Sequence, residues 1–421
     1  MLGSQSSTAN EASVCVIGLG YIGLPTAAVI ASNDVRVVGV DVDEERIDQI
    51  NRGEAPFFEP DFETTLAGVV AQGRLSAQVR MPRAESFIIA VPTPFGVGHS
   101  IDTTYIEDAC SQISAKLTGG ELIVLESTSP PGTTEKVAEF ILDLRPDLTA
   151  DSDKPNSIYF AHCPERVLPG RIMAEISTND RIIGGLTPRG AERARALYAQ
   201  FCTGQLLVTD AATAELAKLT ENAFRDVNIA FANELSLICD RVGIDVRELI
   251  KLANHHPRVN ILNPGPGVGG HCIAVDPWFI VAAAPEESQL IATARSVNDG
   301  KPEWVVDKIL GMAAKFKDPI IAALGITFKA NVDDLRGSPA VEIVERVATR
   351  LPASCIRVVD PKISSLPAQI ARYQNVQHET IDGALASADV VVLLVDHADF
   401  YEIDPKQLEE KSVLDTRGVW S

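Results

Sequence analysis

Short apolar runs separated by helical patterns fill the N-terminal part of the chain. Each run has the length of one strand and ends at Gly, Pro, Asp or Ser. The runs cover residues 14–20, 35–41, 86–92, 121–127 and 157–164. Strands buried on both faces show as continuous apolar runs, and strands that alternate with helices are typical of a doubly wound parallel sheet. We therefore expect the chain to begin with an α/β domain of this kind, with its first helix near residues 24–32.

The pattern changes to a single long helix from about Thr213. Helical periodicity continues for about 30 residues, and neither Pro nor Gly interrupts it before Gly243. At ~1.5 Å per residue such a helix exceeds about 40 Å, which is too long for one compact domain. We expect it to bridge two domains or to form the core of a dimer. A shorter helix, residues 244–254, is predicted to follow it.

A second α/β series begins near Pro319. Its strand-like runs cover residues 320–328, 354–361, 389–396 and 412–418, and a helical pattern covers residues 339–351. The predicted fold class is therefore α/β, with two Rossmann-like doubly wound domains joined by a long central helix and a helical dimerisation region. We place the domains at residues 1–211, 212–302 and 303–421. The two end domains could be structural echoes of each other.

Composition narrows the class of protein. The chain has 421 residues, enough for two or three domains, and its 46% of hydrophobic residues suffices for well-formed cores. The net charge is −20, and no run of Lys or Arg exceeds two residues. A protein that binds nucleic acid by its phosphates needs a basic surface, so nucleic acid is not an expected partner.

The chain also lacks the usual signals of membranes and secretion. No stretch of about 18 apolar residues occurs, so no membrane span is expected. The polar start MLGSQSSTANEAS lacks the features of a signal peptide. The seven Cys residues form no CxxC pair, which fits reduced thiols in the cytoplasm. No metal site is expected.

A glycine fingerprint follows the first predicted strand. Gly18, Gly20 and Gly23 form a GxGxxG motif with Leu19, Tyr21 and Ile22 between them. Between a strand and a helix, the first glycine makes a tight turn, the second admits a pyrophosphate, and the third lets the helix pack on the strand. The helix N-terminus offers N–H groups to the phosphates. The motif predicts a dinucleotide site.

Asp41 closes the second predicted strand and bears on the choice of dinucleotide. A carboxylate there binds the ribose hydroxyls of NAD and repels the 2′-phosphate of NADP, although Asp41 could simply cap a turn. Arg46 would favour NADP, but it lies beyond the strand end and is expected to stack on the adenine side. Thr93 and Thr128 follow the next strong strands and are either nicotinamide contacts or ordinary turn hydroxyls. We predict NAD as the cofactor.

Residues 265–278, GPGVGGHCIAVDPW, place four glycines before Cys272. Glycines let a backbone come close to a bound ligand, and a Cys after such a loop, possibly at a helix start, is suited to be a nucleophile. On the predicted long helix, Lys218, Asn222 and Arg225 share one face because their spacing is i, i+4, i+7. That face is either a solvated polar stripe or part of a site.

Six motifs resemble the UDP-glucose/GDP-mannose dehydrogenase family, in the family's order and along nearly the whole chain. They cover residues 16–25, 126–135, 162–170, 218–245, 255–279 and 325–340. The resemblance implies a four-electron oxidation of sugar carbon 6 with two NAD+. The alcohol becomes an aldehyde, which adds to a Cys as a thiohemiacetal, is oxidised to a thioester, and leaves as the uronate. It also implies an NAD-binding first domain, a central dimerisation domain that carries the catalytic Lys and Cys, and a C-terminal UDP-sugar domain.

The positions that match catalytic residues of the family are Cys272, Lys218, Asp276, Asn222, Thr128 and Glu165. By resemblance, Cys272 is the nucleophile, Lys218 the general acid/base or oxyanion stabiliser, and Asp276 the carboxylate that positions the hydrolytic water. Thr128 and Asn222 hold this water or the sugar hydroxyls. Glu165 matches a glutamate linked to thioester hydrolysis.

Binding residues are implied in the same way. For NAD they are Gly18, Gly20, Tyr21, Ile22, Gly23, Asp41, Arg46, Thr93, Thr128 and Arg336. For the substrate they are Arg166, Val167, Lys218, Asn222, Arg225, His256, Arg258, Gly269, Phe328, Lys329 and Arg417. In the family the arginine at Arg258 tends to come from the partner subunit, which implies a homodimer. Lys329 and Arg258 could supply the positive charge that a diphosphate needs in an acidic protein.

Departures from the family's UDP-glucose branch bear on the sugar. Pro169 stands where that branch has a second glutamate, and Val275 where it has a lysine. The Arg166-Val167 pair fits the N-acetylhexosamine branches. Segments 225–245 and 255–262 favour UDP-N-acetylmannosamine, whose oxidation would feed bacterial surface polysaccharide synthesis. UDP-N-acetylglucosamine, UDP-glucose and GDP-mannose stay alternatives.

Two other classes of protein are also open. A two-electron NAD dehydrogenase of the hydroxyacid type would share the first domain and the long helix but would need no thiol. A non-catalytic sensor of nucleotide sugars would keep the glycines and lose the chemistry. The joint presence of Lys218, Cys272 and Asp276 argues against the sensor.

Overall fold

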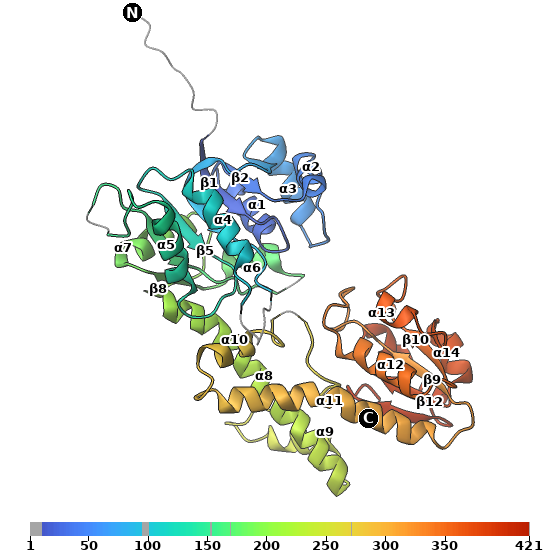
Figure 1. Ribbon diagram of the computed structural model, residues 1–421. Coiled ribbons are helices and arrows are strands. Elements are labelled where there is room, and N and C mark those ends of the chain that lie inside the picture. Colours follow the sequence, from blue (N-terminus) through green and yellow to red (C-terminus); the bar gives the residue numbers. More distant parts are fainter. Residues whose placement is uncertain (1–10, 95–100, 152–153, 169, 271, 421) are drawn as a thin grey trace, which may run out of the picture. The chain divides into compact units, whose positions relative to one another are not determined.

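The computed structural model describes residues 11–94, 101–151, 154–168, 170–270 and 272–420. The chain divides into two compact units, Met1–Thr220 and Glu221–Ser421. The boundary falls inside helix α8 (Ala211–Val242). This helix is continuous over that range, which confirms the long uninterrupted helix predicted from the sequence (Figure 1). Within the described residues, no helix is both long enough and apolar enough to cross a membrane.

The described part of the first unit is built around a sheet of eight strands. In spatial order these are β3 (Leu75–Gln78), β2 (Val37–Val40), β1 (Glu11–Ile17), β4 (Arg83–Ile89), β5 (Leu122–Leu125), β6 (Tyr159–His162), β7 (Arg181–Gly185) and β8 (Leu206–Asp210). The expectation of a fully parallel sheet is wrong at one place, because β7 runs antiparallel to β6, with His162 opposite Gly184. The β7 strand was not predicted, since two of its five residues are glycines, which weaken a strand pattern.

Helices cover both faces of this sheet. They are α1 (Gly23–Ser32), α2 (Glu44–Asn51), α3 (Phe62–Ala71), α4 (Thr104–Ser114), α5 (Thr133–Leu144), α6 (Ile172–Thr178) and α7 (Pro188–Tyr198). Side chains alternate along a strand, and Val14 and Val16 of β1 pack in one apolar cluster with α1 and α3. Cys15 and Ile17 pack in a second cluster with α4 and α5. This arrangement confirms the doubly wound architecture.

The second unit contains most of α8 together with α9 (Val246–Ala253), α10 (Asp276–Ala283) and α11 (Gln289–Ala313). Buried polar pairs join α8 to α11, among them Arg295 to Asp226 at 2.6 Å and Asn233 to Asn298 at 2.9 Å. The sequence did not predict α11, because Pro302 lies inside it and prolines usually end helices.

The second unit also holds a sheet whose described strands all run parallel. In spatial order they are β11 (Val376–His378), β10 (Cys355–Val359), β9 (Ile320–Leu324), β12 (Val390–Leu393) and β13 (Ser412–Asp415). The helices around it are α12 (Pro339–Arg350), α13 (Ala368–Ala371), α14 (Ile381–Ser387) and two short 3₁₀ helices, η2 (Ala398–Glu402) and η3 (Pro405–Gln407). Alternate residues of β12 pack against α11 and α12 on one face and against α14 on the other. The second predicted α/β domain is therefore confirmed.

Candidate active site

The glycine turn of the first unit has the geometry of a dinucleotide cradle. Gly18 has φ +89° and donates its N–H to the carbonyl of Val40 at 2.8 Å. A Cβ atom at Gly18 would lie 2.5 Å from the carbonyl oxygen of Ala90, and one at Gly23 would lie 2.0 Å from that of Gly18. At Gly20, by contrast, no protein atom lies within 4 Å of the Cβ position. The first and third glycines serve backbone packing, and the second leaves the open space that a pyrophosphate requires.

The carboxylate of Asp41 lies directly behind this turn. It accepts the N–H of Leu19 at 2.8 Å and that of Asp43 at 3.0 Å. The guanidinium of Arg46 pairs with the same carboxylate at 3.1 Å and with Asp43 at 3.5 Å. Arg46 was expected on the adenine side, and in this structure it neutralises Asp41. Asp41 therefore holds the glycine turn in place as well as presenting a charge at the strand end.

The carboxyl ends of neighbouring strands bring the other expected NAD residues of this unit together. Thr93 and Thr128 follow β4 and β5, which are adjacent in the sheet, and both are partly buried. The hydroxyl of Ser127 donates to the carbonyl of Val91 at 2.7 Å and ties the two loops to each other. Tyr21 is partly exposed, and its hydroxyl donates to Glu59 at 3.2 Å.

The first turns of α8 are anchored to α5 by a residue that the sequence reasoning missed. Glu215 accepts the N–H groups of Gly132 and Thr134 at 2.6 and 2.7 Å, and the hydroxyl of Thr134 at 2.6 Å. A carboxylate at a helix N-terminus is a favourable cap, and a GTT start to α5 was the available signal. Lys218 follows one turn later and is buried, with 7% of its surface exposed. Burial, with a smaller contribution from the charge of Lys218, lowers the pKa of His162, at the end of β6, to about 3.

The loop after β6 carries the residues expected at the sugar. The side chain of its glutamate, Glu165, is directed toward Arg181 of β7. Glu165 accepts the N–H of Arg166 at 2.6 Å and pairs with Arg181 at 2.8 Å. Arg166 also donates to the carbonyl of Asp180. Val167 packs against the apolar cluster beside α1. Pro169, named as a departure from the UDP-glucose branch, lies outside the described residues.

In the second unit, the structure brings Cys272, Asp276 and Asn222 together. Cys272 is exposed, and its carbonyl accepts the N–H of Asp276 at 2.8 Å, so the thiol residue lies one turn before α10. Asp276, the first residue of α10, is buried and accepts the amide N–H of Asn222 on α8 at 2.6 Å. The other described cysteines are buried or half-buried. An exposed cysteine one helical turn before an oriented, buried carboxylate suits nucleophilic chemistry followed by hydrolysis.

The glycines before Cys272 pack closely against other segments of the protein. A Cβ atom at Gly269 would lie 2.5 Å from the carbonyl oxygen of Gly337, and one at Gly270 would lie 3.0 Å from the ring of Phe328. A Cβ atom at Gly265 would lie 2.6 Å from the guanidinium of Arg417. The loop therefore contacts Phe328 and Arg417, two of the residues expected to bind the substrate.

The remaining expected residues lie at the surface. Arg225 is an exposed residue of α8, and the exposed segment 255–260 contains His256 and Arg258. The ring of His256 accepts the N–H of Arg258 at 3.3 Å. Lys329 is exposed, and Arg336 makes a two-point ion pair with Asp334.

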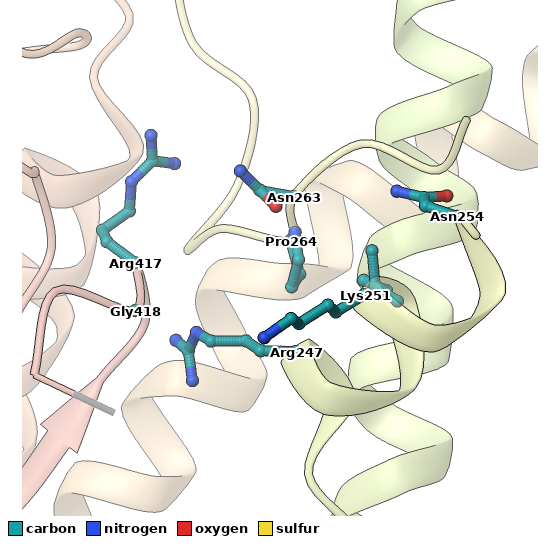
Figure 2. A pocket seen from close by; sticks show the side chains of 8 residues that line it. Arg247, Lys251, Asn254, Asn263, Pro264, Arg417 and Gly418 are labelled. Atoms are coloured by element: carbon teal, nitrogen blue, oxygen red, sulfur yellow. The ribbon is translucent and has the colours of Figure 1, made fainter.

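A cationic cavity of about 230 Å³ lies in the second unit. Figure 2 shows Arg247 and Lys251 of α9 reaching toward Arg417 and Gly418, with Asn254 and Asn263 at its wall. Arg247 donates to the carbonyl of Asp415 at 2.7 Å, and a Cβ atom at Gly418 would lie 2.1 Å from its Nε. The sequence motifs pointed to Arg417 and missed Arg247 and Lys251. Their i, i+4 spacing on one helix was the signal available.

Comparison with known proteins agrees with this geometry. The chain matches models of the UDP-glucose/GDP-mannose dehydrogenase family for the NAD binding domain over residues 12–202, the central domain over 212–300 and the UDP binding domain over 322–421. The fold and site define an NAD-dependent dehydrogenase that acts on nucleotide sugars. The chain belongs to the UDP-glucose/GDP-mannose dehydrogenase family, as the sequence motifs predicted.

Individual relatives are similar over nearly their whole length. The chain is 53% identical to an NDP-N-acetyl-D-galactosaminuronic acid dehydrogenase of Ralstonia nicotianae, over 97% of this chain and 96% of the relative. It is 50% identical to the UDP-N-acetyl-D-mannosamine dehydrogenase of Escherichia coli K12, over 97% and 99%. A solved structure of a UDP-D-ManNAc dehydrogenase from Pyrococcus horikoshii superposes with a TM-score of 0.86 at 39% identity, over 97% and 96%.

Proposed function

We propose that this enzyme oxidises carbon 6 of UDP-N-acetylmannosamine to the carboxylate, with two NAD+ reduced per sugar. The observation that carries the proposal is the arrangement of Cys272, Asp276 and Asn222 in the second unit. A two-electron dehydrogenase needs neither a thiol nor a carboxylate for hydrolysis. In balance, RCH2OH, two NAD+ and water give RCOO−, two NADH and three protons.

Each residue has a defined part in this chemistry. Bound NAD+ accepts the hydride in both oxidations. Lys218 takes the hydroxyl proton of the alcohol or stabilises the alkoxide that remains. The sulfur of Cys272 adds to the aldehyde carbon and keeps it bound until the second oxidation. Asp276, oriented by Asn222 at 2.6 Å, accepts a proton from the water that attacks the thioester, and Thr128 holds that water or the substrate.

NAD is held by the first unit. The open space at Gly20 takes the pyrophosphate, and the N–H groups at the start of α1 face it. Asp41 accepts hydrogen bonds from the adenosine ribose, which requires Arg46 to share the carboxylate or to move aside. Thr93 contacts the nicotinamide side, and Arg336 of the second unit contacts NAD.

The substrate's diphosphate and sugar are held by cations and loop residues. Arg166 and Val167 contact the N-acetylated sugar, Arg225 and His256 border it, and Gly269 supplies backbone. Phe328, Lys329 and Arg417 bind the uridine diphosphate, and Arg258 arrives from a partner subunit. We also propose three functional domains, residues 1–211, 212–302 and 303–421, and a cytoplasmic location.

A second candidate substrate is UDP-N-acetylgalactosamine. The relative that is 53% identical is named for N-acetyl-D-galactosaminuronic acid. The two sugars differ in ring stereochemistry, so the same thiol and carboxylate serve either one. The choice concerns sugar contacts and leaves the chemistry at carbon 6 unchanged.

The test is NADH stoichiometry with each of UDP-N-acetylmannosamine, UDP-N-acetylgalactosamine, UDP-N-acetylglucosamine and UDP-glucose. We expect two NADH and one uronate per UDP-N-acetylmannosamine, with the uronate identified by mass spectrometry. Cys272→Ala should form no uronate. One NADH per sugar, an aldehyde product and full activity of Cys272→Ala would instead support a two-electron dehydrogenase.

We further propose that the enzyme is a homodimer through α8. Phe224, Phe231 and Ile238 recur every seven residues on this helix, and their exposed fractions are 70%, 50% and 50%. A seven-residue apolar repeat is the pattern of a helix that packs along another helix, and a contiguous exposed apolar stripe usually marks an interface. A second copy presents the same stripe, which suits a two-fold interface.

A further inference from the structure

The reversal of β7 places an arginine at the carboxyl edge of the first sheet. In a fully parallel sheet, ligands bind at the carboxyl ends of the strands, so the first residue of each strand lies at the opposite edge. Because β7 is antiparallel to β6, with Ala161 opposite Gly185 and His162 opposite Gly184, its first residue, Arg181, lies level with the loop that follows β6. Glu165 is in that loop.

Arg181 stands between two carboxylates. Its Nη2 lies 2.8 Å from Glu165 Oε2, and its Nη1 lies 3.8 Å from Oε1 of Glu126, the residue after β5. The exposed fractions of the three side chains are 4%, 8% and 0% for Arg181, Glu165 and Glu126. One guanidinium therefore serves two carboxylates that water hardly reaches. We call these three residues the edge triad.

Neutral side chains also pack against the edge triad. Tyr198, at the end of α7, donates its hydroxyl to Glu126 at 3.2 Å, and its ring lies 5.1 Å from the guanidinium of Arg181. Cys163 of the β6 loop and Thr26 of α1 also face Glu126. If both carboxylates were ionised, the buried group would carry one net negative charge in a medium that solvates it poorly.

We propose that Arg181 and Glu126 are positioning residues that hold Glu165, and with it the Arg166-Val167 segment that meets the sugar. This inference rests on the proposed function, because it gives the loop after β6 a place at the substrate. Glu165 accepts the N–H of Arg166 through its second oxygen, so the ion pair fixes the start of that segment directly. Downstream, Glu175 accepts the N–H of Leu168 at 2.9 Å, and Glu59 accepts those of Gly170 and Ile172 at 2.9 and 2.8 Å.

The edge triad makes the positioning of Glu165 depend on pH. Burial and the negative charge of Glu165 raise the pKa of Glu126 to about 8, against the opposing effects of Arg181, Tyr198 and Thr26. At neutral pH, Glu126 is protonated and the guanidinium is committed to Glu165. When Glu126 ionises, it competes for Arg181, and the tie to Glu165 weakens. The KM for the nucleotide sugar should therefore rise above pH 8.

The test compares Glu126→Gln with the wild-type enzyme between pH 6.5 and 9.5. The amide keeps an acceptor for Tyr198 and cannot ionise. We expect the wild-type KM to rise by up to ~10-fold per pH unit above about pH 8, and the variant's KM to stay flat. Glu192→Gln is the matched control, since Glu192 pairs with Arg195 on the exposed face of α7 and should leave the wild-type profile unchanged. Parallel profiles of wild type and Glu126→Gln would overturn the inference.

A second measurement does not depend on turnover. Because the folded-state pKa of Glu126 is raised, the stability of the wild-type protein should fall as pH rises from about 4.5 to about 8, relative to Glu126→Gln. Glu165→Gln removes the repulsion and should move the end of that fall to lower pH. Equal pH slopes in wild type and Glu126→Gln would contradict the inference. Failure of the wild-type enzyme to oxidise any UDP-sugar would refute the proposed function and leave this stability test intact.

Discussion

Replacing Asn233 by Ala should separate the thiol loop from the helix that supports it. Asn233 lies on α8 and is fully buried. The Oδ1 of its side-chain amide accepts the N–H of Gly265 at 2.9 Å, and the Nδ2 donates to Asn298 Oδ1 on α11 at 2.9 Å. Gly265 begins the glycine loop that leads to Cys272. A single amide therefore links two helices to the residues before the nucleophile.

The cost of the substitution can be worked out from these two bonds. Asn233→Ala leaves the N–H of Gly265 and one oxygen of Asn298 without these partners in a buried place. Each such group costs about 1–3 kcal/mol, so the variant should lose about 2–6 kcal/mol of unfolding free energy. A domain of this kind has about 5–15 kcal/mol in total, so the variant should fold but be clearly weakened. Displacement of the loop should also lower kcat by at least ~10-fold, since a 1 Å error in positioning costs up to about 100-fold.

Urea unfolding, NADH turnover and thiol labelling check this prediction together. Cys272 is exposed while the other described cysteines are buried or half-buried, so the fast phase of labelling reports on its loop. The dissociation constant of NAD should not change, because the glycine turn of the first unit is untouched. Thr293→Ala on α11 is the matched control, since it removes an exposed hydroxyl bonded to the carbonyl of Gln289. A loss of less than about 1 kcal/mol with wild-type turnover would refute the reasoning.

Three further substitutions test separate parts of the molecule. Gly269→Ala should lower kcat and cost about 1–3 kcal/mol of unfolding free energy, because its methyl group would lie 2.5 Å from the carbonyl oxygen of Gly337. The control Gly311→Ala has open space around it in α11 and should be neutral or stabilising. Unfolding curves of the two variants check this prediction. Phe231→Asp should turn the dimer into monomers in light scattering, and Tyr105→Asp, an exposed aromatic on α4, should not. Asp41→Asn should raise the KM for NAD by about 10-fold and reduce discrimination against NADP, as measured by NADH and NADPH formation.

The parts of the fold that the sequence predicts are those fixed by local patterns. Strands β1, β4, β5 and β12 were found because burial on both faces requires continuous apolar runs. The end of α8 was found at Gly243, which has a positive φ, a backbone conformation that glycine adopts readily. The order of strands and the direction of β7 depend on non-local pairing, which no local pattern records.

The site follows the same division. Motif residues such as Asn222, Cys272 and Asp276 could be named from the sequence, and the structure brings them together. Arg181 and Glu126 could not be named, because each is a single charged residue whose meaning comes from the reversal of a strand. Glycines signal a close approach of some atom, but the sequence does not say which one. For that reason the loop before Cys272 was assigned to a ligand alone, whereas two of its glycines also lie close to Gly337 and Phe328.

The same kind of turn follows β1 in the first sheet and β9 in the second. The features that the two turns share are those that the fold requires. Gly325 after β9 has φ +82° and donates to the carbonyl of Val359 at 2.7 Å, as Gly18 does to Val40 at 2.8 Å. Asp360 accepts the N–H groups of Ile326 and Lys362 at 2.7 and 2.9 Å, as Asp41 accepts those of Leu19 and Asp43. A glycine and a strand-end aspartate are therefore what this turn requires in either sheet.

The two turns differ in the side chain that contacts the aspartate. Asp360 meets the fully buried His397 at 3.2 Å, and the other ring nitrogen of His397 accepts the N–H of Asn331 at 2.9 Å. Asp41 instead meets Arg46, whose side chain is 36% exposed. Protein groups occupy the second turn, while the first combines a partly exposed partner with the open space at Gly20. The open space and the partly exposed cation beside the first turn, rather than the aspartate that both turns share, therefore distinguish the dinucleotide site from its counterpart in the second sheet.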